Sequence, residues 1–274
     1  MSDQTAKALP DKMPRNKAFF TREYFETIKE GSRKSAEEII PFIMELTHPK
    51  SVVDVGCGEG IWLAVFQEQG VEDILGIDGN YINKDGLAIS SDHFLPLDLT
   101  KLIKLDRQFD LVVSLEVAQY IPLESAEIFV SSLTKLGPII LFSASVPLQG
   151  ESHPVNEQWP DFWVRHFIKK GYMVVDNIRK KVWENDNVEW WYAQNTLLFI
   201  EKSHLDRFLS LKMEATDSVN SQISIVHPKN YLAKANPLNW SLRVILSVLP
   251  ILVLNSLKAR LQNILHRIMR VNQS

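Results

Sequence analysis

The sequence predicts an α/β protein: a Rossmann-like, doubly wound and mostly parallel sheet with an antiparallel edge strand, N-terminal helices and a C-terminal helical tail. Three observations lead to this prediction. Short apolar runs alternate with longer runs of helical periodicity between residues 51 and 143. A glycine-rich turn follows the first apolar run. Two further strand-like runs, 172–178 and 195–202, lie close together beyond the next helical segment.

Helical periodicity begins ahead of the sheet. Apolar residues from Tyr24 to Ile43 recur at helical spacing, but Gly31 and Pro41 interrupt the pattern. We therefore expect two short helices before the core. The strands that follow are expected in 51–55, 73–78, 93–98, 109–114 and 138–143, with helices in 60–69 and 124–136. This alternation is typical of a parallel sheet with crossover helices.

The chain after the fifth strand is more varied. A polar, aromatic stretch at 149–161 precedes a helix expected over 162–170, and the two strand-like runs that follow should form an antiparallel edge. Residues 214–236 are polar and lack periodicity, which predicts a linker. The chain thus divides into an N-terminal arm with helices (1–48), the sheet domain (49–202), a helix and linker (203–236) and basic amphipathic helices (237–274).

The composition excludes several function classes. Among 274 residues only Cys57 is a cysteine, so the chain has no internal disulfide and no Cys/His cluster at zinc spacing. We expect Cys57 to fill space in a turn, and we expect no metal site. The first twenty residues contain no continuous apolar stretch, so no secretory signal is predicted. We expect a cytoplasmic location.

Charge is unevenly distributed along the chain. The net charge is −3, yet no Asp or Glu follows Asp217, and the seven basic residues beyond it leave −10 for residues 1–217. An acidic body argues against nucleic acid as a partner. The basic tail indicates a contact of another kind.

The clearest chemical pattern is the motif V-V-D-V-G-C-G-E-G-I, which starts in the first strand. Gly56, Gly58 and Gly60 follow the strand and open a helix, where a doubly wound fold binds its ligand. A dinucleotide site needs its third glycine one position later, where this chain has Ile61. The acid at the strand end, Asp54, suits a cationic or zwitterionic ligand better than a pyrophosphate.

Two further acids stand at the ends of the next strands. Asp78 closes the second strand, at the sheet edge where a ribose diol would lie. Asp98 closes the third strand, where its carboxylate or the Leu99 backbone could meet the amino group of an adenine. The alternative for Asp98 is a helix cap ahead of Thr100. The glycines and acids together predict a nucleoside-containing ligand.

With these residues in this order, the segment 51–120 resembles the class I S-adenosylmethionine-dependent methyltransferases. The resemblance implies S-adenosyl-L-methionine as the cofactor. The resemblance implies that Asp54, Gly56 and Gly58 hold the methionine end, with Gly60 completing the motif. It further implies Asp78 for the ribose, and Asp98 with Leu99 for the adenine. Glu116, after the fourth strand, matches the acidic position that the family places beside the transferable methyl.

The stretch S-L-E-V-A-Q-Y-I departs from the family in one respect. Many relatives read Glu-Val-x-Glu-His there, whereas this chain has Gln119 and Tyr120. The run from about residue 32 to residue 200, with the segments G-S-R-K-S-A at 31–36 and H-P-V-N-E-Q-W-P-D-F-W at 153–163, resembles a bacterial subgroup linked with sugar or glycan modification. The resemblance therefore implies methyl transfer, with O-methylation of a sugar, glycan or small molecule as the expected reaction.

A hydroxyl acceptor would benefit from a general base. The loop after the fifth strand offers His153, which is the first candidate, and Glu116 is the second. The alternative for His153 is a partly exposed loop histidine that hydrogen-bonds the backbone.

Three residues near this loop are candidates for contact with the acceptor: Asn156, Trp159 and Trp163. The two tryptophans lie four apart, so on a helix they share a face and could stack against a sugar or staple the helix to its sheet. Residues 190–192, Trp-Trp-Tyr, carry the same ambiguity, and their polar neighbours favour the rim of a pocket.

Two other functions compete with methyl transfer. A nicotinamide-dependent oxidoreductase is disfavoured by Ile61 in the glycine motif. A non-catalytic protein could keep the same fold for nucleoside binding alone, since Tyr120 stands at a commonly basic position. Such a scaffold should show a glycine loop closed by bulky neighbours.

The C-terminal tail combines apolar and basic residues. The run 242–254 is apolar apart from Arg243 and Ser247, and we expect Pro250 to kink the chain between two helices. The uninterrupted part is too short for the roughly 20 residues that span a bilayer, so a transmembrane helix is not predicted. Beyond it, apolar residues keep helical spacing among basic ones. This pattern fits a helix at the periphery of an anionic membrane, or a stripe packed on the protein's own core or a second subunit.

Overall fold

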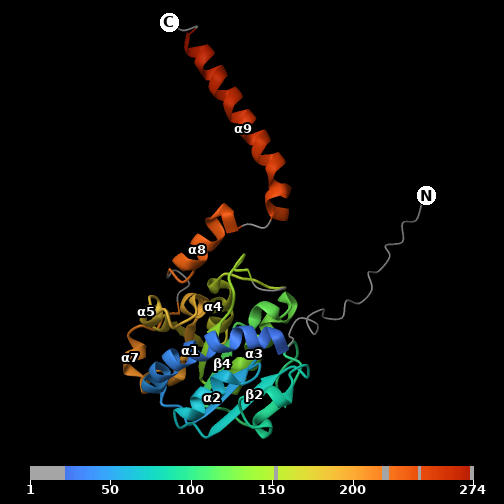
Figure 1. Ribbon diagram of the computed structural model, residues 1–274. Helices are drawn as coiled ribbons and strands as arrows, with labels where there is room; N and C mark the ends of the chain where they lie inside the picture. The colour runs from blue at the N-terminus through green and yellow to red at the C-terminus, as the bar shows by residue number, and fades with distance from the viewer. Residues whose placement is uncertain (1–21, 151–153, 218–221, 240–241, 272–274) are drawn as a thin grey trace, which may run out of the picture. The chain divides into compact units, whose positions relative to one another are not determined.

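The computed structural model describes residues 22–150, 154–217, 222–239 and 242–271 (Figure 1). The chain divides into two compact units, Met1–His227 and Pro228–Ser274. The first unit holds the sheet, and the second consists of helices. The boundary between them falls inside the stretch predicted as a linker.

The first unit is built on a seven-stranded sheet with the order β3-β2-β1-β4-β5-β7-β6. Neighbouring strands from β3 to β5 run parallel, whereas β7 runs antiparallel to both β5 and β6. The predicted fold class, including its antiparallel edge, is confirmed. The strands are β1 (Ser51–Val55), β2 (Asp73–Asp78), β3 (Phe94–Pro96), β4 (Leu111–Leu115), β5 (Ile139–Ser143), β6 (Tyr172–Val175) and β7 (Leu197–Glu201).

Helices cover both faces of this sheet, which explains the continuous apolar runs of its strands. Successive strand residues point to opposite faces, so Val52 belongs to one core cluster and Val53 to the other. The first cluster includes residues of α1 (Arg22–Thr47), α2 (Ile61–Glu68), α5 (Ile178–Val182) and α6 (Trp190–Asn195). The second includes residues of α3 (Ala126–Leu136) and α4 (Pro160–Lys169).

The helix α1 corrects the prediction of two short N-terminal helices, because it runs through both Gly31 and Pro41. Gly31 marks a close approach: a Cβ there would lie 2.3 Å from Oε1 of Glu189. An interior proline costs about 3 kcal/mol. Burial of Ile39, Ile40 and Ile43, each 0% exposed, contributes about 1.5–3 kcal/mol per side chain and offsets that cost.

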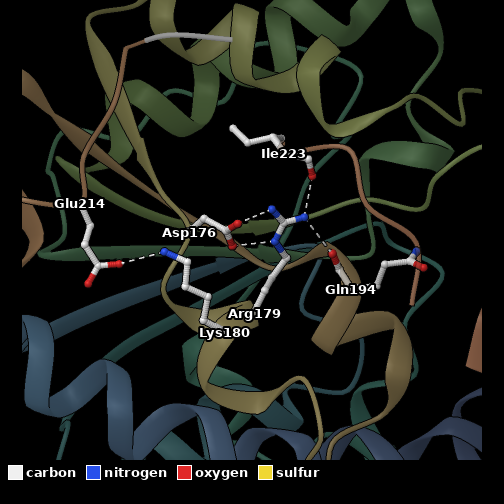
Figure 2. A network of polar contacts seen from close by, with 6 residues as sticks. All are labelled: Asp176, Arg179, Lys180, Gln194, Glu214 and Ile223. Atoms are coloured by element: carbon white, nitrogen blue, oxygen red, sulfur yellow. Dashed lines mark hydrogen bonds and ion pairs between the residues drawn. The ribbon is translucent and has the colours of Figure 1, made fainter. Parts of the chain in front are cut away.

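The end of the first unit is also more ordered than predicted. After α7 (Leu209–Lys212), Thr216 forms a β-bridge with Val174. Arg179, only 1% exposed, then anchors the following segment, since its Nη1 donates to the backbone oxygens of Ile223 at 2.7 Å and Gln194 at 3.3 Å (Figure 2). Its Nε also donates to Asp176 at 2.6 Å. Residues 222–227 are therefore attached to the sheet domain, and the linker prediction was wrong for them.

The second unit contains α8 (Pro228–Ala235), a single turn at Pro237–Asn239 and the helix α9 (Leu242–Val271). The helix α8 lies wholly within 214–236 and was not predicted. Pro250 lies inside α9, which is one helix of 30 residues, so the predicted break between two helices was wrong. Proline removes a backbone donor, and the apolar residues on both sides keep helical geometry around it.

Candidate functional site

A cavity of about 1330 Å³ lies at the carboxyl ends of β1, β2, β3 and β4. The sheet order places β1 between β2 and β4, so the strands after β1 extend the sheet first on one side of β1 and then on the other. Such a switch point opens a crevice where doubly wound folds bind ligands. Most of the predicted site residues line this cavity, namely Asp54, Gly56, Gly58, Asp78, Asp98, Leu99 and Glu116.

The glycine turn brings backbone to the cavity wall. Gly56 has φ +89°, and a Cβ there would lie 2.2 Å from a methyl carbon of Val117. Both observations require glycine at this position. Gly60, with φ +79°, starts α2 instead, and a Cβ there would lie 2.9 Å from Ile89. The structure therefore places Gly56 on the cavity and Gly60 behind it, where it sets the start of the helix.

Asp54 lies in β1 and is 3% exposed. Burial raises the pKa of its carboxyl well above the usual range, and the nearby Asp78 raises it further. No residue in the described ranges donates a hydrogen bond to this carboxylate. A buried acid that faces a cavity in this way suits a cationic group brought by a ligand.

We expect Asp54→Asn to raise the thermal midpoint of the ligand-free protein by about 2–4 °C at neutral pH, the change that about 1 kcal/mol produces in a chain of this size. Because the pKa of Asp54 is raised in the folded state, the folded protein binds more protons at this position than the unfolded chain does. Ionisation of Asp54 therefore lowers the free energy of unfolding as pH rises above 3.8. Thermal unfolding from about pH 4 to about pH 8 measures this, with the exposed Asp106→Asn as control. A lower midpoint for Asp54→Asn at neutral pH would contradict the assignment.

Asp78, at the end of β2, joins the glycine turn to the next loop. Its Oδ2 accepts from Gly58 N at 2.8 Å, and its Oδ1 accepts from Gly79 N and the Tyr81 hydroxyl, both at 2.6 Å. Burial raises the pKa of Asp78, and these three donors oppose the rise. The carboxylate is held in one orientation at the cavity edge.

Asp98 and Leu99 follow β3 at the far wall. Oδ1 of Asp98 accepts from the Thr100 hydroxyl at 2.7 Å and from Thr100 N at 3.0 Å, and the hydroxyl bond is the main cause of its lowered pKa. These bonds close a local turn, and no helix begins here, so the helix-cap alternative was wrong. Because Asp98 also lines the cavity, it can fix the Leu99 backbone there.

Glu116 follows β4 with φ +56°, which is rare for a residue with a side chain and costs about 1–3 kcal/mol. Its amide N donates to Oγ of Ser143 at 3.0 Å. The carboxylate accepts from three side-chain amides: Asn195 Nδ2 at 3.0 Å, Gln149 Nε2 at 3.3 Å and Gln119 Nε2 at 3.4 Å. We call these three residues the amide cage.

The amide cage was missed at the sequence level. Its members come from three separate segments, and only Gln119 is near Glu116 in the chain. Gln149 and Asn195 are 4% and 3% exposed, and Asn195 Nδ2 also donates to Gln149 Oε1 at 2.9 Å. The cage connects further, since Gln194 Nε2 donates to Gln149 Oε1 at 3.1 Å. Glu116 therefore stands at the end of a buried polar network.

The three residues predicted to contact the acceptor, Asn156, Trp159 and Trp163, do not line the cavity. Trp163, 1% exposed, packs on Phe142 with ring centroids 5.6 Å apart, so the stapling interpretation holds for it. Trp159 and Asn156 do not line the cavity either, and the backbone N of Asn156 donates to Gln119 O at 3.0 Å. His153 lies outside the described residues. In contrast, residues 190–192 do line the cavity, as the rim interpretation predicted.

Comparison with known proteins identifies the family of the chain. A family model described as a methyltransferase domain matches residues 28–207, about two thirds of the chain. The chain belongs to this methyltransferase family. It is an S-adenosylmethionine-dependent enzyme of class I, and the matched region contains the whole sheet and the residues of the cavity up to Tyr192.

Solved structures resemble the methyltransferase at low identity. The plantazolicin methyltransferase BpumL, in complex with a pentazolic desmethylPZN analog and SAH, is 15% identical, with a TM-score of 0.50 over 69% of this chain and 92% of that one. DesVI of Streptomyces venezuelae is 12% identical, with a TM-score of 0.49 over 65% and 96%. ChlM, the magnesium protoporphyrin IX methyltransferase of Synechocystis PCC 6803, is 16% identical, with 0.49 over 72% and 100%. No curated protein sequence matches the methyltransferase.

The geometry of the site also bears on the competing functions. A scaffold without a pocket should have a closed glycine loop, whereas Gly56 and Gly58 border an open cavity. Within the described residues no group of three or more His, Cys, Asp or Glu side chains could hold a metal ion. The chemistry of the cavity wall consists of buried acids, backbone amides and aromatic rings.

Proposed function

We propose that the enzyme methylates a hydroxyl group of a sugar, glycan or other small molecule. The observation that carries the proposal is Glu116, which lines the cavity that bears the glycine turn and whose carboxylate is fixed by the amide cage. A carboxylate fixed in this way is suited to accept the proton of a hydroxyl. A neutral amine already carries a nucleophilic lone pair, so it depends less on such a base than a hydroxyl does.

The residues of the cavity fit the cofactor. Asp54 offers a buried acid for the ammonium group of its methionine part, and the positive φ values of Gly56 and Gly58 let backbone approach closely. Asp78 offers a fixed carboxylate for the ribose hydroxyls. When bound, S-adenosylmethionine supplies an activated methyl group on a sulfonium centre.

The chain's own part in the reaction is to position and to shield. Glu116 would take the proton from the acceptor hydroxyl as its oxygen is methylated, and the amide cage keeps the carboxylate aligned. Tyr192 lines the same cavity, is buried against Trp62 with ring centroids 5.2 Å apart and has a pKa raised by burial. Its ring excludes water, which strengthens the electrostatic interactions within the site.

Aromatic side chains support a sugar as the acceptor. Trp190 and Trp191 both line the cavity, with ring centroids 5.5 Å apart and planes at 85°. Sugar rings present apolar C–H faces that pack on aromatic rings, while their hydroxyls need hydrogen-bond partners. Trp190 and Trp191 could therefore pack on the apolar face of a sugar ring.

The proposal is tested by supplying S-adenosylmethionine with an isotope-labelled methyl group to the full-length enzyme with a panel of sugars, amines and carboxylates. Mass spectrometry locates the label on the product. Label on an ether oxygen supports the proposal. Transfer to nitrogen or to a carboxylate alone would overturn O-methylation while leaving the enzyme class unchanged.

His153 remains a candidate for the general base, and the rate of the His153→Ala variant distinguishes its role from that of Glu116. If His153 is the base, His153→Ala lowers kcat by on the order of a hundredfold, with cofactor affinity little changed. The geometry around Glu116 instead leads us to expect a change of less than about threefold in kcat for His153→Ala. Steady-state rates with a saturating acceptor decide, and His166→Ala on α4 serves as the control.

A further inference from the structure

The second unit carries an unusual combination of exposed apolar surface and positive charge. Within α9, the segment Val244–Gln262 is long and apolar enough to cross a membrane by length and composition, and none of it is buried. Its large exposed side chains include Leu246, Ile251, Leu252, Val253, Leu254 and Leu257. The sequence did not predict a segment of this length, because its uninterrupted apolar part is shorter than the roughly 20 residues that span a bilayer.

The apolar part of α9 is apolar all round. Residues 244–254 contain only Ser247 and Pro250 as breaks, so at 100° per residue apolar side chains project in every direction. A surface helix of a soluble domain normally has one apolar stripe and one polar face. Packing against one neighbour would leave the other sides of this segment exposed, whereas lipid covers all sides at once.

The single hydroxyl in that part is satisfied locally. Oγ of Ser247 donates to the backbone oxygen of Val244 at 2.8 Å. In hydrocarbon each polar hydrogen needs an internal acceptor, because water is absent. The side chains of residues 244–254 therefore bring no hydroxyl without an acceptor into lipid.

Charge selects the surface that α9 would enter. Beyond Asp217 the chain has no Asp or Glu, and its basic residues stand on both sides of the apolar part: Lys229, Lys234 and Arg243 before it, and Lys258, Arg260, Arg267 and Arg270 after it. This arrangement complements anionic lipid headgroups. Two copies packed through α9 would instead bring these like charges together without an acid to pair them.

The distribution of charge also determines the depth. Residues 244–254 extend about 17 Å as a helix, well short of the roughly 30 Å of a hydrocarbon core, so the part between the basic flanks does not reach from one face of the bilayer to the other. Basic residues favour the anionic cytoplasmic face, and here they flank both ends of the apolar part. Both ends therefore favour the same face of the bilayer.

We propose that α9 inserts into one leaflet of an anionic lipid membrane, with residues 244–254 in the hydrocarbon and the basic flanks among the headgroups. Lys258 and Arg260 lie within the candidate span, and their long side chains can reach the headgroup layer. Attachment through α9 would bring the methyltransferase to acceptors at a membrane. This attachment does not depend on which acceptor is methylated.

The test is flotation of the full-length protein with vesicles of phosphatidylcholine, alone or mixed with phosphatidylglycerol, at low and high salt. We expect flotation with the anionic vesicles, weakened by salt. Ile251→Asp should lower vesicle affinity by on the order of a hundredfold, whereas Met213→Asp, at a side chain 91% exposed in the first unit, should not change it. Lys258→Gln with Arg260→Gln should lower affinity by about tenfold or more, and the exposed pair Lys50→Gln with Lys104→Gln serves as the control.

Two results would overturn the proposal. Absence of flotation together with a doubled molar mass in solution, lost in Ile251→Asp, would assign α9 to a second copy of the chain. A C-terminal tag that is protected from protease added outside sealed vesicles would mean that α9 crosses the bilayer. Cofactor binding by each variant, measured by calorimetry, shows that it is folded.

Discussion

Glu116→Gln should lower kcat by on the order of a thousandfold, with the affinity for S-adenosylmethionine little changed. General base catalysis contributes about 10²- to 10⁴-fold, and the amide lacks the basic lone pair that accepts the proton. The size of the side chain is kept, so the cavity should keep its shape. Single-turnover rates measure the chemical step, and calorimetry measures cofactor binding.

The amide cage gives this prediction its controls. Asn195→Ala removes the shortest hydrogen bond to the Glu116 carboxylate, the 3.0 Å contact with Oε1, and should lower kcat by about tenfold while KM changes little. Glu124→Gln alters another acid that lines the same cavity and should leave the rate within about twofold. If Glu116→Gln retains the full rate, the base is His153 or the reaction uses none.

Gly56→Val should lower the affinity for S-adenosylmethionine by at least about a hundredfold. A Cβ at this position would lie 2.2 Å from Val117, and the backbone at φ +89° is itself unfavourable for a side chain. Relief of the clash would displace the turn or Val117, and both border the cavity. Isothermal titration with S-adenosylmethionine and with its demethylated product measures the loss.

Two further variants separate this local effect from a loss of folding. Gly70→Val imposes the same backbone strain at φ +91°, but nothing lies within 4 Å of its Cβ, so cofactor affinity should be kept. Asp78→Ala removes the acceptor for the Gly58 and Gly79 amides and for the ribose hydroxyls, and should also lower affinity by about a hundredfold. Normal affinity in both Gly56→Val and Asp78→Ala, or binding of a nicotinamide dinucleotide instead, would place the cofactor elsewhere.

The sequence was sufficient for the sheet, the fold class, and the glycines and acids that line one part of the cavity. These features depend on short-range patterns: apolar runs of strand length, glycines directly after β1, and an acid at the end of each of the first strands. Because the carboxyl ends of parallel strands meet at one edge, order in the chain predicts proximity in space. Asp54, Gly56, Gly58 and Asp78 were placed together for that reason.

Tertiary structure decided what short-range patterns could not. Burial of Ile39, Ile40 and Ile43 against the sheet kept α1 continuous through Pro41, where a local breaker signal predicted an end. Trp163 is buried in the core, whereas residues 190–192 line the cavity, although all belong to aromatic clusters of similar appearance in the sequence.

The contrast is clearest at Glu116. The sequence by itself identified this acid and placed it after β4, because that position follows from the strand pattern. Only the fold showed that amides from positions 119, 149 and 195 converge on its carboxylate, since those segments meet through the pairing of β5 with β7 and the loops at the cavity. A hydrogen bond between residues 79 positions apart leaves no local periodicity to detect, so the glycine turn and its acids were readable from the chain and the environment of Glu116 was not.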